Sequence, residues 1–406
     1  MTNDIKWAGN RFKGQHKSAI DFLSKNEIAK VRNFHASLPD YQATPLHRLD
    51  DLAKQFGVGG IYVKDESFRF GLNAFKALGA SYAIGRWLTD RLGSDTKTVS
   101  FKELSSLASD NKFTEVTFTT ATDGNHGRGV AWTARQLGQK AVVYMPEGSS
   151  TFRVENIRGE DAEVYITDCN YDDTVRMAAD NAAKNGWVVV QDTAWPGYED
   201  IPLYIMQGYA TIAAECVEQL NSLGIEKPTH IFVQAGVGSF AAAIQGYFTA
   251  AFGEERPKTI VVEADQAACL LKLAEARDGQ PQAVGGSLTT IMAGLACGEA
   301  NYIAWNILRD YSDMFFACPD WVAARGMRIL GSPVGEDSRV ISGESGAVTT
   351  GLLSVLLKDS RLQAVRETLS LNQESRVLLI STEGDTDPEQ YRRIVWDGEY
   401  SSPGVD

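Results

Sequence analysis

Residues 230–243, HIFVQAGVGSFAAA, decide the fold. The run 230–234 is mostly apolar with little polar alternation, which is typical of a strand buried on both faces of a sheet. Gly236 and Gly238 allow a tight turn, and the alanine-rich residues after them favour a helix. A buried strand, a glycine-rich turn and a helix, in this order, form the repeating unit of an α/β fold with parallel strands.

The same unit recurs through most of the chain. Further short apolar runs predict strands at 60–63, 115–119, 141–145, 163–166, 187–191, 259–263 and 376–381. Amphipathic stretches predict helices at 73–88, 128–137, 172–184 and 203–223. We therefore expect an α/β protein in which helices cover both faces of parallel sheets.

Two interruptions of this alternation predict domain boundaries. The polar stretch 92–112 and the turn Trp195-Pro196-Gly197 mark the places where we expect the chain to enter and leave a smaller domain. The predicted large domain comprises residues 1–97 and 195–406, and the small inserted domain comprises residues 98–194. A chain of 406 residues is long enough for two domains.

The composition is that of an ordinary globular protein. Apolar residues make up 44 % and charged residues 22 % of the chain, and 52 acidic against 39 basic residues give a formal net charge of −13. This charge disfavours nucleic acid or an anionic membrane as the main partner. An anionic ligand would need local attraction that overcomes the net field.

Cysteine and histidine positions offer no metal site. No two of the five cysteines lie within four residues of each other, and their odd, low number fits a reducing compartment. Whether Cys269 and Cys297 meet in space stays open at this point. The first residues lack the apolar run of a signal peptide, and no window approaches the ~18 apolar residues of a membrane helix. We therefore expect a cytoplasmic protein.

Ligands bind in open α/β sheets where strands end and helices begin, so polar side chains at these junctions are the site candidates. Lys76 follows the strand 60–63 and lies in the expected first helical turn, between Phe75 and Ala77. The positive end of a helix and apolar neighbours should lower the pKa of its amine, which suits Schiff-base chemistry. The alternative is a surface lysine whose stem packs on apolar residues.

Two glycine-rich junctions predict anion sites. The loop 119–129, TTATDGNHGRG, exposes backbone amides that bind carboxylates or phosphates. Asp123 is unusual there, because a carboxylate repels an anion unless it accepts protons; an N-cap role is the alternative. The loop 236–239, GVGS, predicts a phosphate cradle. It lacks the last glycine of GxGxxG, which favours a phosphomonoester over a dinucleotide.

Together with the strand end 379–387, LISTEGDTD, these motifs resemble in order the fold-type II family of pyridoxal-phosphate enzymes, the tryptophan synthase β and threonine dehydratase group. The matching motifs are Thr44-Pro45-Leu46, Asn73-Ala74-Phe75-Lys76-Ala77, Asp123-Gly124-Asn125-His126, Gly236-Val237-Gly238-Ser239 and Ser381-Thr382-Glu383-Gly384-Asp385. The strings 121–132, 195–209 and 380–387 closely resemble the diaminopropionate ammonia-lyases of that family.

The resemblance implies two α/β domains with the active site in the cleft between them, and pyridoxal 5'-phosphate as cofactor. The implied cofactor-binding residues are Lys76 (through a Schiff base), Asn125, Gly236, Val237, Gly238, Ser239 and Ser381, with Thr382 as the alternative to Ser381 at the pyridine nitrogen. The implied substrate-binding residues are Thr122, Asp123, Gly124, His126 and Asp192. His126 and Asp192 have structural alternatives, as a loop cap and an N-cap, and Glu344 resembles a motif residue near the ring.

The resemblance also implies the reaction, an α,β-elimination that converts D- and L-2,3-diaminopropionate to pyruvate and ammonia. Lys76 abstracts the Cα proton of one isomer, and Asp123 is placed to serve the other, because one base reaches one face of a planar centre. The family is typically homodimeric. The alternatives are a serine or threonine dehydratase of the same fold, a noncatalytic α/β binding protein and a nicotinamide dehydrogenase.

Overall fold

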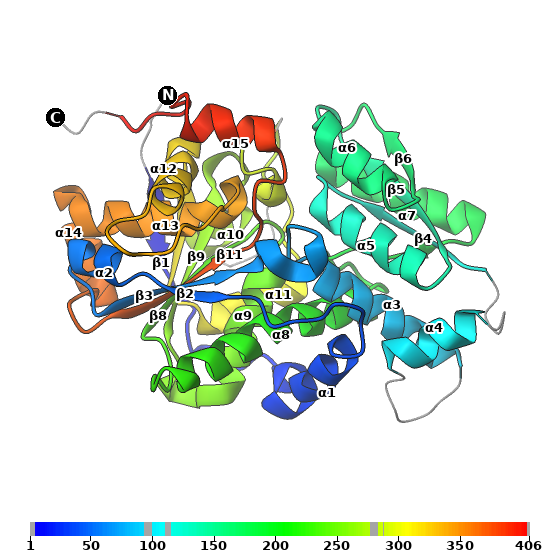
Figure 1. Cartoon of the computed structure of the whole chain (residues 1–406), viewed down its shortest axis with the longest axis horizontal. Coiled ribbons are helices and arrows are strands. Elements are labelled where there is room, and N and C mark those ends of the chain that lie inside the picture. Colours follow the sequence, from blue (N-terminus) through cyan, green and yellow to red (C-terminus); the bar gives the residue numbers. More distant parts are fainter. Residues whose placement is uncertain (1–4, 93–99, 110–114, 277–282, 287, 404–406) are drawn as a thin grey trace.

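The strands of the chain form two separate sheets (Figure 1), as described by a computed structural model that covers residues 5–92, 100–109, 115–276, 283–286 and 288–403. The larger sheet has the order β1-β10-β9-β8-β11-β3-β2. Its strands are β1 (Lys6–Gly9), β2 (Leu46–Arg48), β3 (Gly60–Asp65), β8 (His230–Gln234), β9 (Lys258–Ala264), β10 (Met314–Cys318) and β11 (Arg376–Ser381). The smaller sheet has the order β6-β5-β4-β7 and consists of β4 (Thr117–Ala121), β5 (Lys140–Met145), β6 (Glu163–Ile166) and β7 (Val188–Val189).

Helices follow most of the strands. In the first half they are α1 (Lys25–His35), α2 (Asp50–Phe56), α3 (Ala77–Arg91), α4 (Phe101–Ser109), α5 (Asn125–Gln136), α6 (Thr151–Arg158) and α7 (Tyr171–Asn185). In the second half they are α8 (Asp200–Ser222), α9 (Ser239–Phe252), α10 (Cys269–Glu275), α11 (Tyr302–Tyr311), α12 (Asp320–Gly331), α13 (Glu344–Lys358), α14 (Gln363–Leu369) and α15 (Pro388–Val395). Within the described part of the chain, no helix is long and apolar enough to cross a membrane.

The predicted strands are confirmed as β3 to β9 and β11, with end shifts of up to two residues, and the four predicted helices as α3, α5, α7 and α8, with end shifts of up to four residues. The sequence analysis missed β1, β2 and β10. The strands β1 and β2 are short, contain no buried residue and run antiparallel to their neighbours, so no buried apolar run marks them. The buried strand β10, MFFAC, lacks β-branched residues, which weakens its strand signal. In the larger sheet, therefore, only the edge strands β1 and β2 run antiparallel to their neighbours, and the strands between them are parallel.

Alternate residues of the central strands pack into two different cores, one on each face of the larger sheet. In β8, Ile231 and Val233 belong to one core and Phe232 to the other. Helices α8, α9 and α11 cover the first face and α2, α12 and α13 the second (Figure 1). Burial on both faces explains why these strands show no polar alternation. The first core continues into the smaller sheet through residues such as Phe118 and Val143.

Each sheet has a point at which the strand order reverses. In the larger sheet the chain runs outward from β8 to β9 and β10, while β11 returns to lie between β8 and β3. In the smaller sheet it runs from β4 to β5 and β6, and β7 returns to the other side of β4. Ligands of open α/β sheets bind at such reversals, beyond the carboxyl ends of the strands.

The strands divide between the sheets at two places in the sequence. All four strands of the smaller sheet lie between residues 98 and 194, and all seven of the larger sheet lie outside that span. On this distribution we propose residues 98–194 as an inserted domain. The expected crossing near residue 98 lies outside the described residues. On the return side, Trp195 and Tyr198 form the expected turn, an isolated bridge before α8.

Candidate active site

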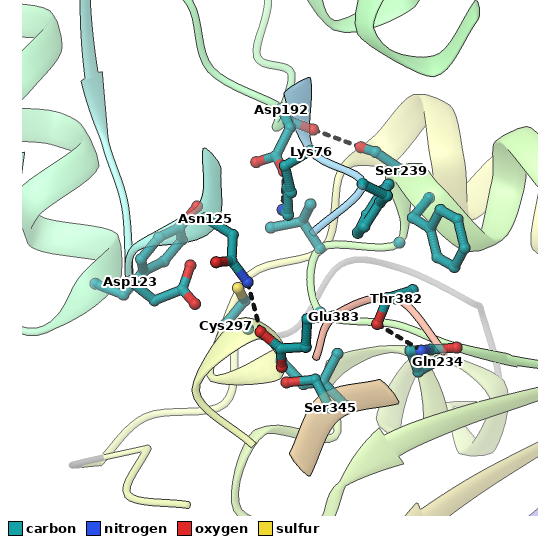
Figure 2. Close-up of a pocket in the computed structure, with 18 residues that line it drawn as sticks. Lys76, Asp123, Asn125, Asp192, Gln234, Ser239, Cys297, Ser345, Thr382 and Glu383 are labelled. Carbon is teal, nitrogen blue, oxygen red and sulfur yellow. Dashed lines mark hydrogen bonds and ion pairs between the residues drawn. The ribbon is translucent and has the colours of Figure 1, made fainter. Parts of the chain in front are cut away.

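A cavity lies where the carboxyl ends of both sheets meet (Figure 2). Loops after β3, β8 and β11 line it from the larger sheet, and loops after β4 and β7 from the smaller sheet. The lining residues include Phe75, Lys76, Asp123, Asn125, Tyr171, Asp192, Gln234, Gly236, Val237, Gly238, Ser239, Gly294, Cys297, Ser345, Thr382 and Glu383. Most of the residues implied by the resemblance thus meet in one place, although they come from distant parts of the chain.

Lys76 is the residue immediately before α3, not a residue of its first turn. Asn73 takes a left-handed backbone (φ 60°) and Ala74 pairs with Glu383, so the helix begins only at Ala77. Gly129 of α5 lies against this backbone, and a Cβ there would come 3.0 Å from the Ala77 Cα. This close approach packs α5 directly against the segment that carries Lys76.

The Lys76 amine forms a buried ion pair. Its Nζ lies 2.6 Å from Asp192 Oδ2, and the two side chains are 17 % and 4 % exposed. Burial alone would lower the pKa of Lys76, but the carboxylates of Asp192 and Asp123 outweigh it and raise the pKa above its usual value. Burial would raise the pKa of Asp192, and Lys76 more than reverses this. The predicted lowering of the Lys76 pKa is therefore wrong, because the sequence could not show the ion pair.

The loop 236–239 forms a turn before α9, with Gly238 in a left-handed conformation (φ 99°). A Cβ on Gly236 would come 3.1 Å from both Cys297 Sγ and Gly294 O, so only glycine fits there without displacement. Asn301 braces the turn: its N–H donates to Val237 O at 2.8 Å, and its Nδ2 donates to Ser239 Oγ at 2.8 Å. Ser239 Oγ in turn donates to Asp192 O.

The side chains of Ser381 and Thr382, at the end of β11, lie on different sides of the strand. Ser381 Oγ donates to Ser342 Oγ at 2.8 Å, and Ser381 does not line the cavity. Thr382 lines it, and its Oγ1 accepts a hydrogen bond of 2.8 Å from Gln234 Nε2. The structure thus brings Thr382 to the cavity wall in place of Ser381, because successive side chains of a strand point in opposite directions.

The loop after β4 brings only two of its side chains to the cavity. Asp123 and Asn125 line it, and Asn125 Nδ2 donates to Glu383 Oε2 (Figure 2). Thr122 instead shapes the loop, because its Oγ1 accepts from the N–H groups of Gly124 and Gly127 at 2.9 and 3.0 Å.

His126 faces away from this cavity as well. Its Nε2 lies 2.7 Å from Val190 O, and burial lowers the pKa of the ring, which favours the neutral form. Neither Thr122, Gly124 nor His126 lines the cavity. The placement of His126 fits its structural alternative, a cap of the loop.

A second, outer cavity adjoins the first and shares Asp123 and Tyr171 with it. Arg153 and Glu344 face each other there, with Nη2 and Oε2 4.0 Å apart. Burial raises the pKa of Glu344 to about 7, against the effect of Arg153. Glu344, which the resemblance placed near the ring, lines this outer cavity and not the inner one. All five cysteines are free, so Cys269 and Cys297 do not pair.

Tyr171, Gln234, Ser345 and Glu383 are among the cavity residues that the sequence analysis did not predict. Gln234 and Glu383 carried a signal, since each is a polar residue at the end of a buried strand. Among the described residues, Gln234 Oε1, Ser345 Oγ and Glu383 Oε1 are buried without a hydrogen-bond partner. Buried polar groups are rarely unpaired, so these atoms indicate a polar ligand.

The sequence matches the family described as pyridoxal-phosphate dependent enzyme over residues 38–382. It is 53 % identical to a diaminopropionate ammonia-lyase from Salmonella typhimurium, over 94 % of this chain and 95 % of the relative. The crystal structure of diaminopropionate ammonia-lyase from Escherichia coli in complex with an aminoacrylate-PLP azomethine reaction intermediate superposes with a TM-score of 0.90 at 48 % identity, covering 98 % of this chain and 99 % of the other. The same enzyme in complex with D-serine superposes with a TM-score of 0.91 at 48 % identity and covers 98 % of each chain.

Proposed function

Because this chain belongs to the diaminopropionate ammonia-lyases of the pyridoxal-phosphate dependent enzyme family, we propose that it converts D- and L-2,3-diaminopropionate to pyruvate and ammonia. The observation that carries this proposal is the meeting of Lys76 and Asp123 in one cavity. They are a basic amine and a carboxylate, and they come from different domains.

The residues of the cavity fit pyridoxal 5'-phosphate. The amides of Gly236, Val237, Gly238 and Ser239 precede a helix of 14 residues, and such a helix end attracts a phosphate. The Lys76 amine would hold the aldehyde, Asn125 the ring oxygen and Thr382 the pyridine nitrogen. A hydroxyl partner favours the unprotonated ring, which suits elimination. The three unpaired atoms of Gln234, Ser345 and Glu383 supply further polar contacts.

When bound, pyridoxal phosphate supplies the electron sink that makes the substrate Cα–H acidic. Asp192 Oδ2 accepts a hydrogen bond of 2.6 Å from Lys76 Nζ and so holds the amine in place at the cavity. In its neutral form Lys76 removes the Cα proton of the L isomer, and the Asp123 carboxylate removes that of the D isomer from the other face. The same carboxylate offers a partner for the second ammonium of a diamino acid, which serine and threonine lack.

Substrate carboxylate binding is proposed for the loop 122–126. Thr122 and Gly124 act through the loop backbone, because the Thr122 hydroxyl is used within the loop. His126 stabilises the loop through the hydrogen bond between its Nε2 and the carbonyl of Val190. Asp192 contacts the lysine, not the substrate, in this arrangement.

The proposed function is tested by a pyruvate assay with pyridoxal phosphate on both isomers of 2,3-diaminopropionate, L-serine and L-threonine. We expect turnover of both diaminopropionate isomers at a kcat/KM at least about tenfold above that of serine and threonine. Faster turnover of serine or threonine would favour the dehydratase alternative. The absence of any lyase activity, together with no visible absorption from bound cofactor, would favour a noncatalytic protein.

We further propose that the enzyme is a cytoplasmic homodimer. The five free cysteines support a reducing compartment, and the dimer is inferred from the family. Light scattering of the purified protein tests it: a mass of twice 44.3 kDa is expected. A single-chain mass at micromolar concentration would contradict the dimer.

A further inference from the structure

Glu383 has a backbone that is fixed on several sides. It pairs with Ala74, its carbonyl accepts from the Gly343 N–H at 2.9 Å, and Ser381 Oγ lies 3.3 Å from the same carbonyl. The residue is only 2 % exposed and lines the inner cavity. Its carboxylate is therefore held in a defined place beside Asn125 (Figure 2).

The two oxygens of this carboxylate have different surroundings. Oε2 accepts from Asn125 Nδ2, and also from Thr386 Oγ1 at 3.2 Å. Oε1 is buried and has no hydrogen-bond partner within the described ranges. A half-satisfied buried carboxylate lowers stability, so its presence calls for a reason other than folding.

An ionised carboxylate only accepts hydrogen bonds, whereas a carboxamide has a donating and an accepting end. With Glu383 as partner, Asn125 must turn its NH₂ toward Oε2, and one hydrogen of that group stays free for the cavity. The positive charge of Arg153 interacts with the side chains of Glu383 and Glu344. Burial lowers the pKa of Arg153, but the charges of Glu383 and Glu344 outweigh this and raise it.

We propose that Glu383 is a positioning residue that fixes the Asn125 carboxamide so that its NH₂ group, and not its carbonyl, meets the ring oxygen of the cofactor. This inference rests on the proposed function, because it assigns Asn125 to that oxygen. Without Glu383, the carboxamide is free to turn its carbonyl toward the ring oxygen, which repels it.

The experiment is a double-mutant cycle with Glu383→Gln and Asn125→Ala, with the dissociation constant for pyridoxal phosphate and the absorption spectrum of the bound form as readouts. Glutamine keeps the shape of glutamate but both donates and accepts, so it no longer dictates the amide orientation. Thermal unfolding of each cofactor-free variant measures folding separately. Glu160→Gln is the matched control, because Glu160 is a buried carboxylate that pairs with Arg128 and Arg135 and does not line the cavity.

We expect Glu383→Gln to weaken cofactor binding about ten- to a hundredfold, as for the loss of a hydrogen bond to a charged group. Its bound spectrum should change, since that hydrogen bond favours the unprotonated ring oxygen. The cofactor-free melting temperature should stay the same or rise. In the Asn125→Ala background the same substitution should have almost no further effect. The control should keep the wild-type affinity within about twofold.

Unchanged affinity and spectrum in Glu383→Gln, or losses that multiply fully in the double variant, would overturn the positioning role and leave the proposed function intact. A melting temperature that falls in proportion to the affinity would also overturn it, since the role would then be structural. If the wild-type protein takes up no pyridoxal phosphate, the proposed function fails and this inference fails with it.

Discussion

The two strand-order reversals of this molecule have the same topology and different chemistry. The reversal of the larger sheet brings glycine amides, Gln234 and Thr382 to the cavity, together with one carboxylate, that of Glu383. The reversal of the smaller sheet brings the carboxylates of Asp123 and Asp192. The strand ends of the larger sheet can therefore hold an anionic group, and those of the smaller sheet can accept and donate protons. Lys76 lies between the two.

The largest effect is expected from a substitution of Lys76, which lies between the two sets of strand ends. Lys76→Ala should abolish the visible absorption of bound cofactor and lower kcat/KM for the L isomer by at least about 10⁴-fold, because it removes the attachment point and the base together. Pyruvate formation and absorption spectra measure this. Lys30→Ala, at a lysine whose side chain is 61 % exposed, is the control. A variant that keeps the absorption would show that another residue binds the aldehyde.

The carboxylates at the strand ends of the smaller sheet are tested by Asp123→Asn. We expect kcat/KM for the D isomer to fall about 10²–10⁴-fold and that for the L isomer by less than about tenfold, since only the D isomer needs this base. Glu147→Gln, an exposed carboxylate at the rim of the outer cavity, should leave both isomers unaffected. Equal losses for the two isomers would rule out separate bases.

The strand ends of the larger sheet are tested by two variants of neighbouring residues. Thr382→Val should weaken cofactor binding about five- to twentyfold, because it removes the hydroxyl on the cavity side. Ser381→Ala should leave the affinity unchanged and cost about 1 kcal/mol of stability through its bond to Ser342. Equilibrium dialysis and urea unfolding separate the two effects. A larger loss of affinity in Ser381→Ala would restore Ser381 to the pyridine nitrogen.

The ion pair between Glu344 and Arg153 in the outer cavity predicts a smaller effect, which is a pH dependence of the stability. The folded-state pKa of Glu344 is raised to about 7, so the folded protein holds this proton at a pH where the unfolded chain has lost it. Its contribution to stability is therefore complete below about pH 4 and is lost as the pH rises to about 7, by roughly 1–3 kcal/mol. Urea unfolding of the cofactor-free protein between pH 4 and 8 measures it. Glu344→Gln should flatten this slope, and an unchanged slope would assign it to another group.

The sequence predicted the parts of the molecule that local pattern determines. Buried strands such as β8 and the glycine turn after it follow from apolar runs and from residue shape, and Lys76, Asp123 and Asn125 were found because they stand at strand ends. The partners of these residues were not predicted. The Lys76–Asp192 ion pair joins residues 116 positions apart, and the Asn125–Glu383 bond joins residues 258 apart. Only the packing of two sheets brings such residues together.

The position of β11 has a consequence for the order in which the protein assembles during synthesis. This strand, Arg376–Ser381, is the last in sequence, yet it forms hydrogen bonds with both β3 and β8 in the middle of the larger sheet. On a ribosome, β3 and β8 emerge 170 residues apart, counted from Gly60 to His230, and stay unjoined until β11 has been made. The smaller sheet, complete by Val189, meets no such delay. A nascent chain therefore gains its cofactor pocket only after β11 has been made.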